Sequence, residues 1–110
     1  MADNWVVVCR DEDLTPGTGV CALVAEEQVA VFKLRPSGEV YAIANYDPIG
    51  KANVLSRGIT GSLGDAVVVA SPLYKQHFNL KTGECLEDAE QSVKTYSVRV
   101  NDGQIEVAAS

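Results

Sequence analysis

Short apolar runs separated by turn residues follow one another along the chain, and this pattern predicts an almost entirely β structure. Residues 66–70 form a continuous run rich in β-branched side chains, which is typical of a buried strand. Residues 96–100 and 105–107 alternate apolar with polar side chains, as half-buried strands do. The other predicted strands cover residues 5–9, 20–24, 29–32, 40–43, 76–80 and 84–86. About nine or ten short strands at this spacing indicate an antiparallel β-sandwich or barrel.

Two clusters of turn residues predict hairpins between neighbouring strands. Asp102 and Gly103 supply the positive φ angles that a type I′ turn requires, so the last two strands are expected to pair. The Arg-Pro-Ser-Gly sequence at 35–38 combines a proline, whose φ is fixed, with a glycine, which accepts positive φ. It predicts a turn between the strands at 29–32 and 40–43.

Residues 45–61 form the least regular part of the chain, with one proline and three glycines and no clear period. A connection of this length in a compact domain is usually functional or disordered. Its apolar side chains, among them Ile49 and Leu55, favour an ordered and packed loop. Single helical turns are expected only near 11–14 and 51–57.

Composition places the chain among ordinary globular proteins and excludes several classes of function. With 110 residues, of which 46% are hydrophobic and 22% charged, residues 1–110 are expected to form one all-β domain. No apolar run approaches the ~20 residues of a membrane helix, and no secretory signal is recognised, so a cytoplasmic location is expected. The net charge of −6 and the scattered basic residues argue against nucleic acid and anionic membranes as partners.

Few residues are available for catalysis or metal binding. The one histidine, His77, lies in a predicted strand, and the sequence places no partner carboxylate for a general base. Cys9, Cys21 and Cys85 lie in apolar runs, where thiols behave as small buried hydrophobes. A zinc site made from these four residues would lack the short ligand spacings of structural zinc sites. The acidic side chains near the end of the chain are expected to be solvated surface: Glu84, Glu87, Asp88 and Glu90. No catalytic, cofactor-binding or metal site is predicted.

Two segments resemble the cluster-binding loops of Rieske ferredoxins. In that family a strand runs into Asn-x-Cys-Pro-His, and a later Cys-Pro-x-His is followed by Phe-Asp-Leu-x-Thr-Gly. Here the first segment reads VYAIANYDPI over 40–49, and the second reads SPLYKQHFNLKTG over 71–83. The flanking positions that agree with the family are Asn45, Pro48, Leu55, Ser56, Pro72, Phe78, Leu80, Thr82 and Gly83. The resemblance implies a Rieske-like all-β fold.

The four ligand positions of that family are occupied by other residues here. Asp47 and Ser71 stand where the family has cysteines, and Ile49 and Tyr74 stand where it has histidines. A Rieske [2Fe–2S] centre needs two thiolates on one iron and two imidazoles on the other. Carboxylate and hydroxyl oxygens are hard donors, whereas iron–sulfur chemistry prefers soft thiolate. We therefore expect no iron–sulfur cluster in this chain.

Loops of this kind in a chain of this length resemble the small subunit of bacterial NAD(P)H-dependent nitrite reductase. The segments that carry this resemblance are TGVCAL (18–23), NYDP (45–48), VLSRG (54–58), ASPL (70–73) and SVK (92–94). The resemblance implies a large partner subunit that holds flavin, sirohaem and an iron–sulfur cluster and reduces nitrite to ammonia during nitrate assimilation. The small chain would be required for that activity without having an active site of its own.

Without metal ligands, the two loops need other interactions to hold them closed. We expect apolar packing by Ile49, Leu73 and Tyr74, with a hydrogen bond from Tyr74 to Asp47. Tyr46, Ile49, Leu73 and Tyr74 then either dock the large subunit or merely plug the end of the barrel. The alternative function is an electron carrier whose cluster is non-standard or held between two chains. A hydrolase or small-molecule binder ranks last, because it would rest on one histidine and scattered carboxylates.

Overall fold

The computed structural model describes residues 4–34 and 38–108, and the regular structure in these ranges is almost all β. The strands are β1 (Trp5–Arg10), β2 (Gly19–Val24), β3 (Glu27–Lys33), β4 (Val40–Ala44), β5 (Tyr46–Asp47), β6 (Ala52–Asn53), β7 (Ile59–Leu63), β8 (Ala66–Ala70), β9 (His77–Asn79), β10 (Thr95–Tyr96), β11 (Val98–Asn101) and β12 (Gln104–Ala108). Three single-turn 3₁₀ helices are described, namely η1 (Asp11–Asp13), η2 (Leu55–Arg57) and η3 (Ala89–Gln91). None of the described helices is long and apolar enough to cross a membrane. The predicted all-β class is confirmed.

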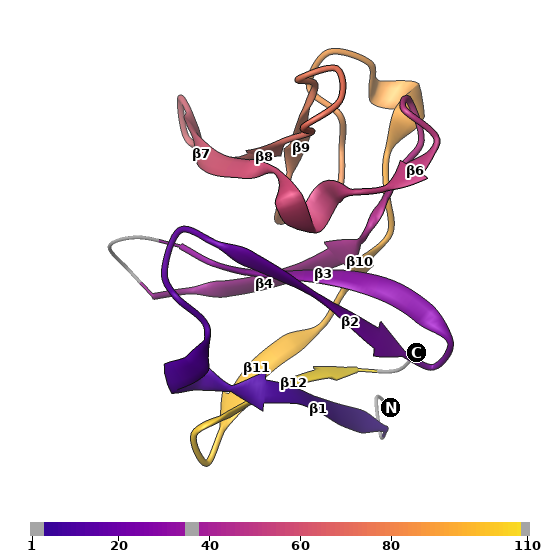
Figure 1. Ribbon diagram of the computed structural model, residues 1–110. Helices are drawn as coiled ribbons and strands as arrows, with labels where there is room; N and C mark the ends of the chain where they lie inside the picture. The colour runs from indigo at the N-terminus through magenta and orange to yellow at the C-terminus, as the bar shows by residue number, and fades with distance from the viewer. Residues whose placement is uncertain (1–3, 35–37, 109–110) are drawn as a thin grey trace.

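The strands stack as three antiparallel layers (Figure 1). The lower sheet has the order β1-β12-β11, the middle sheet β10-β4-β3-β2 and the upper sheet β7-β8-β9. The short strands β5 and β6 pair as a separate hairpin beside the upper sheet. The described residues contain twelve strands, more than the nine or ten expected. β5, β6 and β7 were not predicted, and the strand predicted at 96–100 is divided into β10 and β11. The strand predicted at 84–86 is wrong, because Cys85 forms only an isolated bridge with Phe78.

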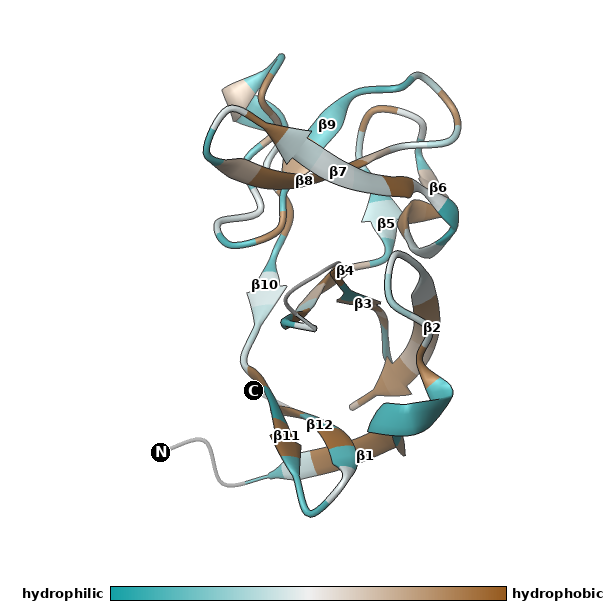
Figure 2. Ribbon diagram, turned by 90° about the vertical axis from the view of Figure 1, so that its left-hand side faces the viewer, coloured by the Kyte–Doolittle hydropathy of each residue, from teal (hydrophilic) through white to brown (hydrophobic). Residues whose placement is uncertain are grey.

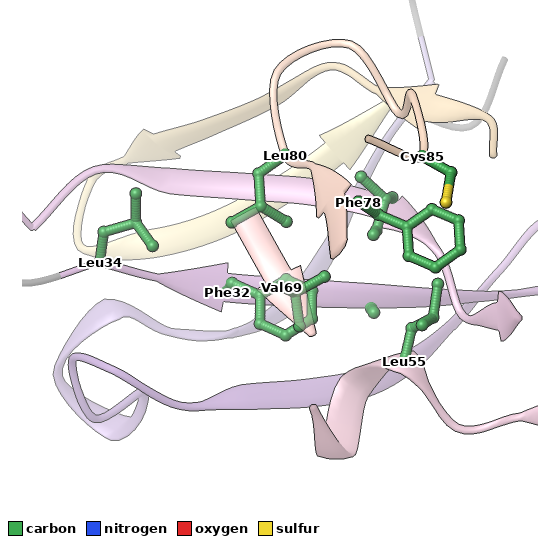
Figure 3. Close-up of a cluster of buried hydrophobic side chains, with 9 residues drawn as sticks. Phe32, Leu34, Leu55, Val69, Phe78, Leu80 and Cys85 are labelled. Carbon is green, nitrogen blue, oxygen red and sulfur yellow. The ribbon is translucent and has the colours of Figure 1, made fainter. Parts of the chain in front are cut away.

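Two apolar cores lie between the layers, one on each face of the middle sheet. Phe32 from β3 meets Val69 and Phe78 from the upper sheet in the first core, which we call the upper core and which also contains Leu55 and Cys85 (Figure 3). The second core joins the other face of β3 to the lower sheet through Val29, Val31, Ile105 and Val107. Because β3 is covered on both faces, its sequence reads as a continuous apolar run rather than an alternating one.

Most of the expected turns are present in the described ranges. Asp102 and Gly103 have φ angles of 56° and 77°, which confirms the predicted hairpin between β11 and β12. Of the predicted turn at 35–38, residues 35–37 lie outside the described residues. The irregular stretch 45–61 is ordered, as expected, and holds β5, β6, η2 and the first residues of β7. The sequence pattern did not identify η3, whose first turn is capped by the Asp88 side chain accepting a hydrogen bond from the backbone N–H of Glu90.

The hairpin between β2 and β3 has a strained turn. Its two turn residues, Ala25 and Glu26, have φ angles of 49° and 69°, in the left-handed region that favours glycine and asparagine. A side chain with a Cβ in this region costs roughly 1–2 kcal/mol per residue. The two strands pair from Gly19 with Phe32 to Val24 with Glu27, so their packing holds the turn in this conformation.

Substituting this turn should stabilise the protein. We expect Ala25→Asn and Glu26→Gly each to raise the free energy of unfolding by about 1 kcal/mol, because Asn-Gly adopts a type I′ turn without that strain. The change would be measured by chemical denaturation. Gly103→Ala is the matched control, since a Cβ there meets no neighbour within 4 Å and adds only backbone strain. It should lower the free energy of unfolding by a similar amount. A Glu26→Gly variant with an unchanged free energy of unfolding would contradict the strain assigned to this turn.

Candidate functional site

The two loops singled out in the sequence meet at one end of the upper part of the molecule, which we call the loop pole (residues 45–58 and 71–76). Asp47 and Ser71 lie at its centre, and neither has any exposed surface. The Ser71 hydroxyl donates a hydrogen bond of 2.5 Å to Asp47 Oδ2. Asp47 Oδ1 accepts from the backbone N–H groups of Ile49 and Gly50 at 2.8 and 3.0 Å. The buried carboxylate therefore joins the two loops and accepts three hydrogen bonds.

The two loops form similar turns on either side of this contact. The backbone N–H of Lys51 donates to the carbonyl of Asp47 at 2.6 Å, and that of Lys75 donates to the carbonyl of Ser71 at 3.1 Å. In each turn a proline follows the first residue, and the last residue is a lysine with positive φ, 58° at Lys51 and 67° at Lys75. Figure 2 shows β5, β6 and the loop that follows β8 on the same side of the molecule.

Close packing between the loops accompanies the hydrogen bonds. A Cβ atom at Gly50 would overlap the side chain of Leu73, so the absence of a side chain there lets the second loop lie directly on the first. A Cβ at Gly58 would overlap the carbonyl of Ala70. Gly58 thus lets two backbones approach closely, whereas Gly50 makes room for the side chain of Leu73.

Asn45 ties the first loop to the middle sheet. Its side chain is 2% exposed, its Oδ1 accepts from the backbone N–H of Ser56 at 2.7 Å, and its Nδ2 donates to Gln28 Oε1 at 3.1 Å. The backbone N–H of Leu55 also donates to the Asn45 carbonyl at 3.0 Å. This asparagine is one of the positions that the sequence shares with the Rieske loops, and in the structure it holds the start of the loop to its end.

The structure corrects part of the predicted loop closure. Ile49 packs against the upper core, and Leu73 packs on Gly50, as expected of apolar contacts. The predicted hydrogen bond from Tyr74 to Asp47 is wrong, because Ser71 is the side-chain donor to that carboxylate and Tyr74 is 63% exposed. Since the short Ser71 hydroxyl already reaches Asp47 inside the protein, the tyrosine ring remains on the surface.

The side chains at these four positions do not fit a Rieske [2Fe–2S] centre. The oxygens of Asp47 and the hydroxyl of Ser71 bond to each other and to loop N–H groups, Ile49 has no lone pair, and Tyr74 offers only a phenol. Within the described ranges, no group of three or more His, Cys, Asp or Glu side chains is placed to hold a metal ion. The donor set lacks the two thiolates and two imidazoles that the cluster requires.

The three cysteines lie apart from one another in different environments. Cys85 is buried in the upper core, as predicted, and Cys9 is half-buried. The prediction that Cys21 is buried is wrong: it lies exposed on β2, an edge strand of the middle sheet, which the local apolar pattern does not reveal. Desolvation raises the pKa of Cys9 and of Cys21, so both are held as thiols rather than thiolates at neutral pH.

His77 has a structural partner that sequence reasoning did not place. Its Nδ1 lies 2.7 Å from Glu87 Oε2, and its backbone N–H donates to Glu87 Oε1 at 2.8 Å. These hydrogen bonds hold the pKa of Glu87 below its ordinary value. The four acidic residues of the predicted solvated cluster are exposed, which confirms that prediction, and Glu87 additionally fastens the segment after β9 to that strand.

Comparison with known proteins matches residues 4–108 to the Rieske-like [2Fe-2S] domain family. The nitrite reductase (NADH) small subunit of Salmonella typhimurium is 48% identical over 104 residues, which is 94% of this chain and 96% of that protein. A solution structure of the nitrite reductase [NAD(P)H] small subunit from Erwinia carotovora is 50% identical with a TM-score of 0.82, and covers 96% of this chain and 82% of that one.

A third relative carries the same domain within a much longer chain. The nitrite reductase [NAD(P)H] large subunit of Klebsiella oxytoca is 37% identical over 101 residues, which is 92% of this chain but 10% of that protein. A domain similar to this chain is thus covalently part of a large subunit in that organism.

Removing the hydroxyl at the centre of the loop pole should destabilise the fold. Ser71→Ala leaves one oxygen of the buried Asp47 carboxylate without its side-chain donor, at an expected cost of about 1–3 kcal/mol in the free energy of unfolding. Asp47→Ala should cost more, because two backbone N–H groups and the serine lose their acceptor together. Chemical denaturation measures both. Ser62→Ala, at an exposed serine on β7, is the matched control and should change stability by less than about 0.5 kcal/mol. Equal stability of the Ser71 and Ser62 variants would contradict the role given to the Asp47–Ser71 contact.

Proposed function

The chain belongs to the Rieske-like [2Fe-2S] domain family and, within it, to the nitrite reductase (NADH) small subunits, and on that basis we propose that it is the non-catalytic small subunit of a cytoplasmic NAD(P)H-dependent nitrite reductase. In this proposal the large subunit reduces nitrite to ammonia and holds the flavin, the sirohaem and the iron–sulfur cluster. The observation that carries it is the loop pole, where a carboxylate–hydroxyl hydrogen bond stands in place of cluster ligands.

The large subunit is the partner that the comparisons favour. In the Klebsiella oxytoca relative, a domain similar to this chain is joined to the large subunit in one polypeptide. A domain that is fused to its partner in one organism and separate in another still needs a contact surface between the two, and the separate form depends on that surface alone. We therefore assign this chain the role of binding the large subunit through its surface.

The exposed side chains of the loop pole are the candidate contact. Tyr46, Leu73 and Tyr74 are 43%, 45% and 63% exposed, although each is apolar or aromatic. They project from loops that the Asp47–Ser71 contact and the upper core hold rigid, and loops on a rigid sheet are the common site of recognition. Ile49 is half-buried and packs against the upper core, so it contributes less than these three to the exposed surface.

Reconstitution with the large subunit of the same organism tests the proposal. Nitrite-dependent NADH oxidation by the large subunit should be low alone and should rise to a plateau as this chain is added. The chain, purified anaerobically and treated with iron and sulfide, should remain colourless, while a Rieske ferredoxin treated in parallel gains visible absorbance. Full activity without the chain would contradict the accessory role. Stoichiometric iron and sulfide in the chain would favour an electron carrier instead.

The docking surface has its own test. Leu73→Ala and Tyr74→Ala should weaken binding to the large subunit and lower the activity at limiting chain concentration, because each removes exposed apolar contact area. Leu23→Ala is the matched control, since Leu23 is 69% exposed on β2, a strand of the middle sheet that belongs to neither loop. Isothermal titration calorimetry measures both. If the Leu23 variant is weakened and the Leu73 variant is not, the contact lies on the other face.

A further inference from the structure

The two lysines that end the loop turns lie at the same pole. Lys51 and Lys75 are exposed, and each occupies the fifth residue of its turn, counted from Asp47 and from Ser71. The first residues of the two turns are hydrogen-bonded to each other, and Gly50 packs on Leu73, so the two turns are in direct contact. Both lysines therefore flank the exposed Leu73 and Tyr74.

The described basic side chains divide into those that form ion pairs and those that do not. Arg10, Lys33, Lys94 and Arg99 form ion pairs within the described part of the chain, with Glu12, Asp11, Glu27 and Glu106. Lys51, Lys75, Arg57 and Lys81 form none with the described residues. The Asp47 carboxylate is buried at the centre of the loop pole and already accepts three hydrogen bonds. A protein of net charge −6 thus presents unpaired cations at the loop pole, with Lys51 and Lys75 on the two turns and Arg57 on η2.

Both lysines are placed at a cost to stability. Their φ angles of 58° and 67° fall in the left-handed region, where glycine would be less strained. Strained positions occur at binding sites and also where strand pairing imposes them, as at Ala25 and Glu26. Lys51 is flanked by the two-residue pairing of β5 with β6, which is much shorter than that of β2 with β3, and Lys75 lies outside the strands. A loop selected only to close the end of the barrel would be more stable with glycine at either position.

We infer that Lys51 and Lys75 form a basic rim around Leu73 and Tyr74, and that this surface docks on an acidic-rimmed apolar patch of the large subunit. The inference rests on the proposed function and adds the charge and chemistry of the partner. An apolar centre with a charged rim is the usual anatomy of a protein interface. The rim is positively charged, whereas the whole chain is negatively charged. The rim therefore directs this end of the molecule towards carboxylates of a partner.

A second copy of the chain is a poor occupant of this surface. A two-fold contact places the same patch of both copies face to face. Lys51 and Lys75 would then meet like charges, with no exposed carboxylate of the two turns to pair them. A partner that supplies carboxylates is required by the charge of the rim.

Charge reversal against a matched control tests the inference. Lys51→Glu and Lys75→Glu should each raise the Kd for the large subunit about fivefold at low salt, mainly through slower association, and the difference should shrink as salt rises. Lys81→Glu is the control, because it makes the same change in net charge at an exposed turn after β9. Surface plasmon resonance gives both rate constants. Reversal at Lys51 and Lys75 without effect, or an equal effect at Lys81, would overturn the inference.

Glycine variants separate docking from folding. Lys51→Gly and Lys75→Gly should bind more weakly while their melting temperatures rise or stay unchanged, since glycine relieves the backbone strain. Carbodiimide cross-linking of the wild-type complex should join Lys51 and Lys75 to carboxylates of the large subunit. Cross-links from Lys81 or Lys94 alone would overturn the inference.

Failure of the inference differs from failure of the proposed function. If the wild-type chain neither binds nor activates the large subunit, the proposed function is wrong. If it binds and activates but the lysine variants behave as wild type, only this docking surface is wrong. Self-association of the wild-type chain, or its binding to anionic vesicles, that is lost in the lysine variants would assign the surface to that other occupant.

Discussion

The carboxylate of Asp47 is the point on which the two loops depend. It is fully buried, and it accepts hydrogen bonds from the hydroxyl of the opposite loop and from two N–H groups of its own. An unpaired charge in this position would be strongly destabilising, whereas a carboxylate with three donors is satisfied. The requirement for those donors fixes the path of residues 47–51 and brings Ser71 against them.

This contact links the fold to the function. The hydrogen bond between Ser71 and Asp47 braces the two loops against each other. Because the hydrogen bonds to Asp47 lie in the protein interior, the outward side chains of the same loops remain available to contact another protein. The Asn45 side chain and the upper core hold the loops to the sheets beneath, so Leu73, Tyr74 and the two lysines project from a rigid base.

The fold was largely predictable because strands and the Asp-Gly turn depend on local sequence. The strained turn at Ala25 and Glu26 was not, since neither residue is typical of positive φ and the packing of β2 on β3 imposes the conformation. The exposure of Cys21 depends on the position of β2 at a sheet edge, which only the tertiary structure determines. The loops of the site were identified from their flanking residues, but the contact between Asp47 and Ser71 joins positions 24 residues apart and follows from no local pattern.

Amide hydrogen exchange of Ile49 and Gly50 tests the central claim most directly, because both N–H groups donate to the buried Asp47 carboxylate. In chelator-treated, iron-free chain, NMR should find both amides protected by roughly a hundredfold or more relative to an unstructured peptide. Protection should be lost at both amides when Asp47 is replaced by alanine, in a variant that still folds. Rapid exchange in the iron-free chain, with protection only after iron and sulfide are added, would contradict the account and show that a metal cluster closes the loops.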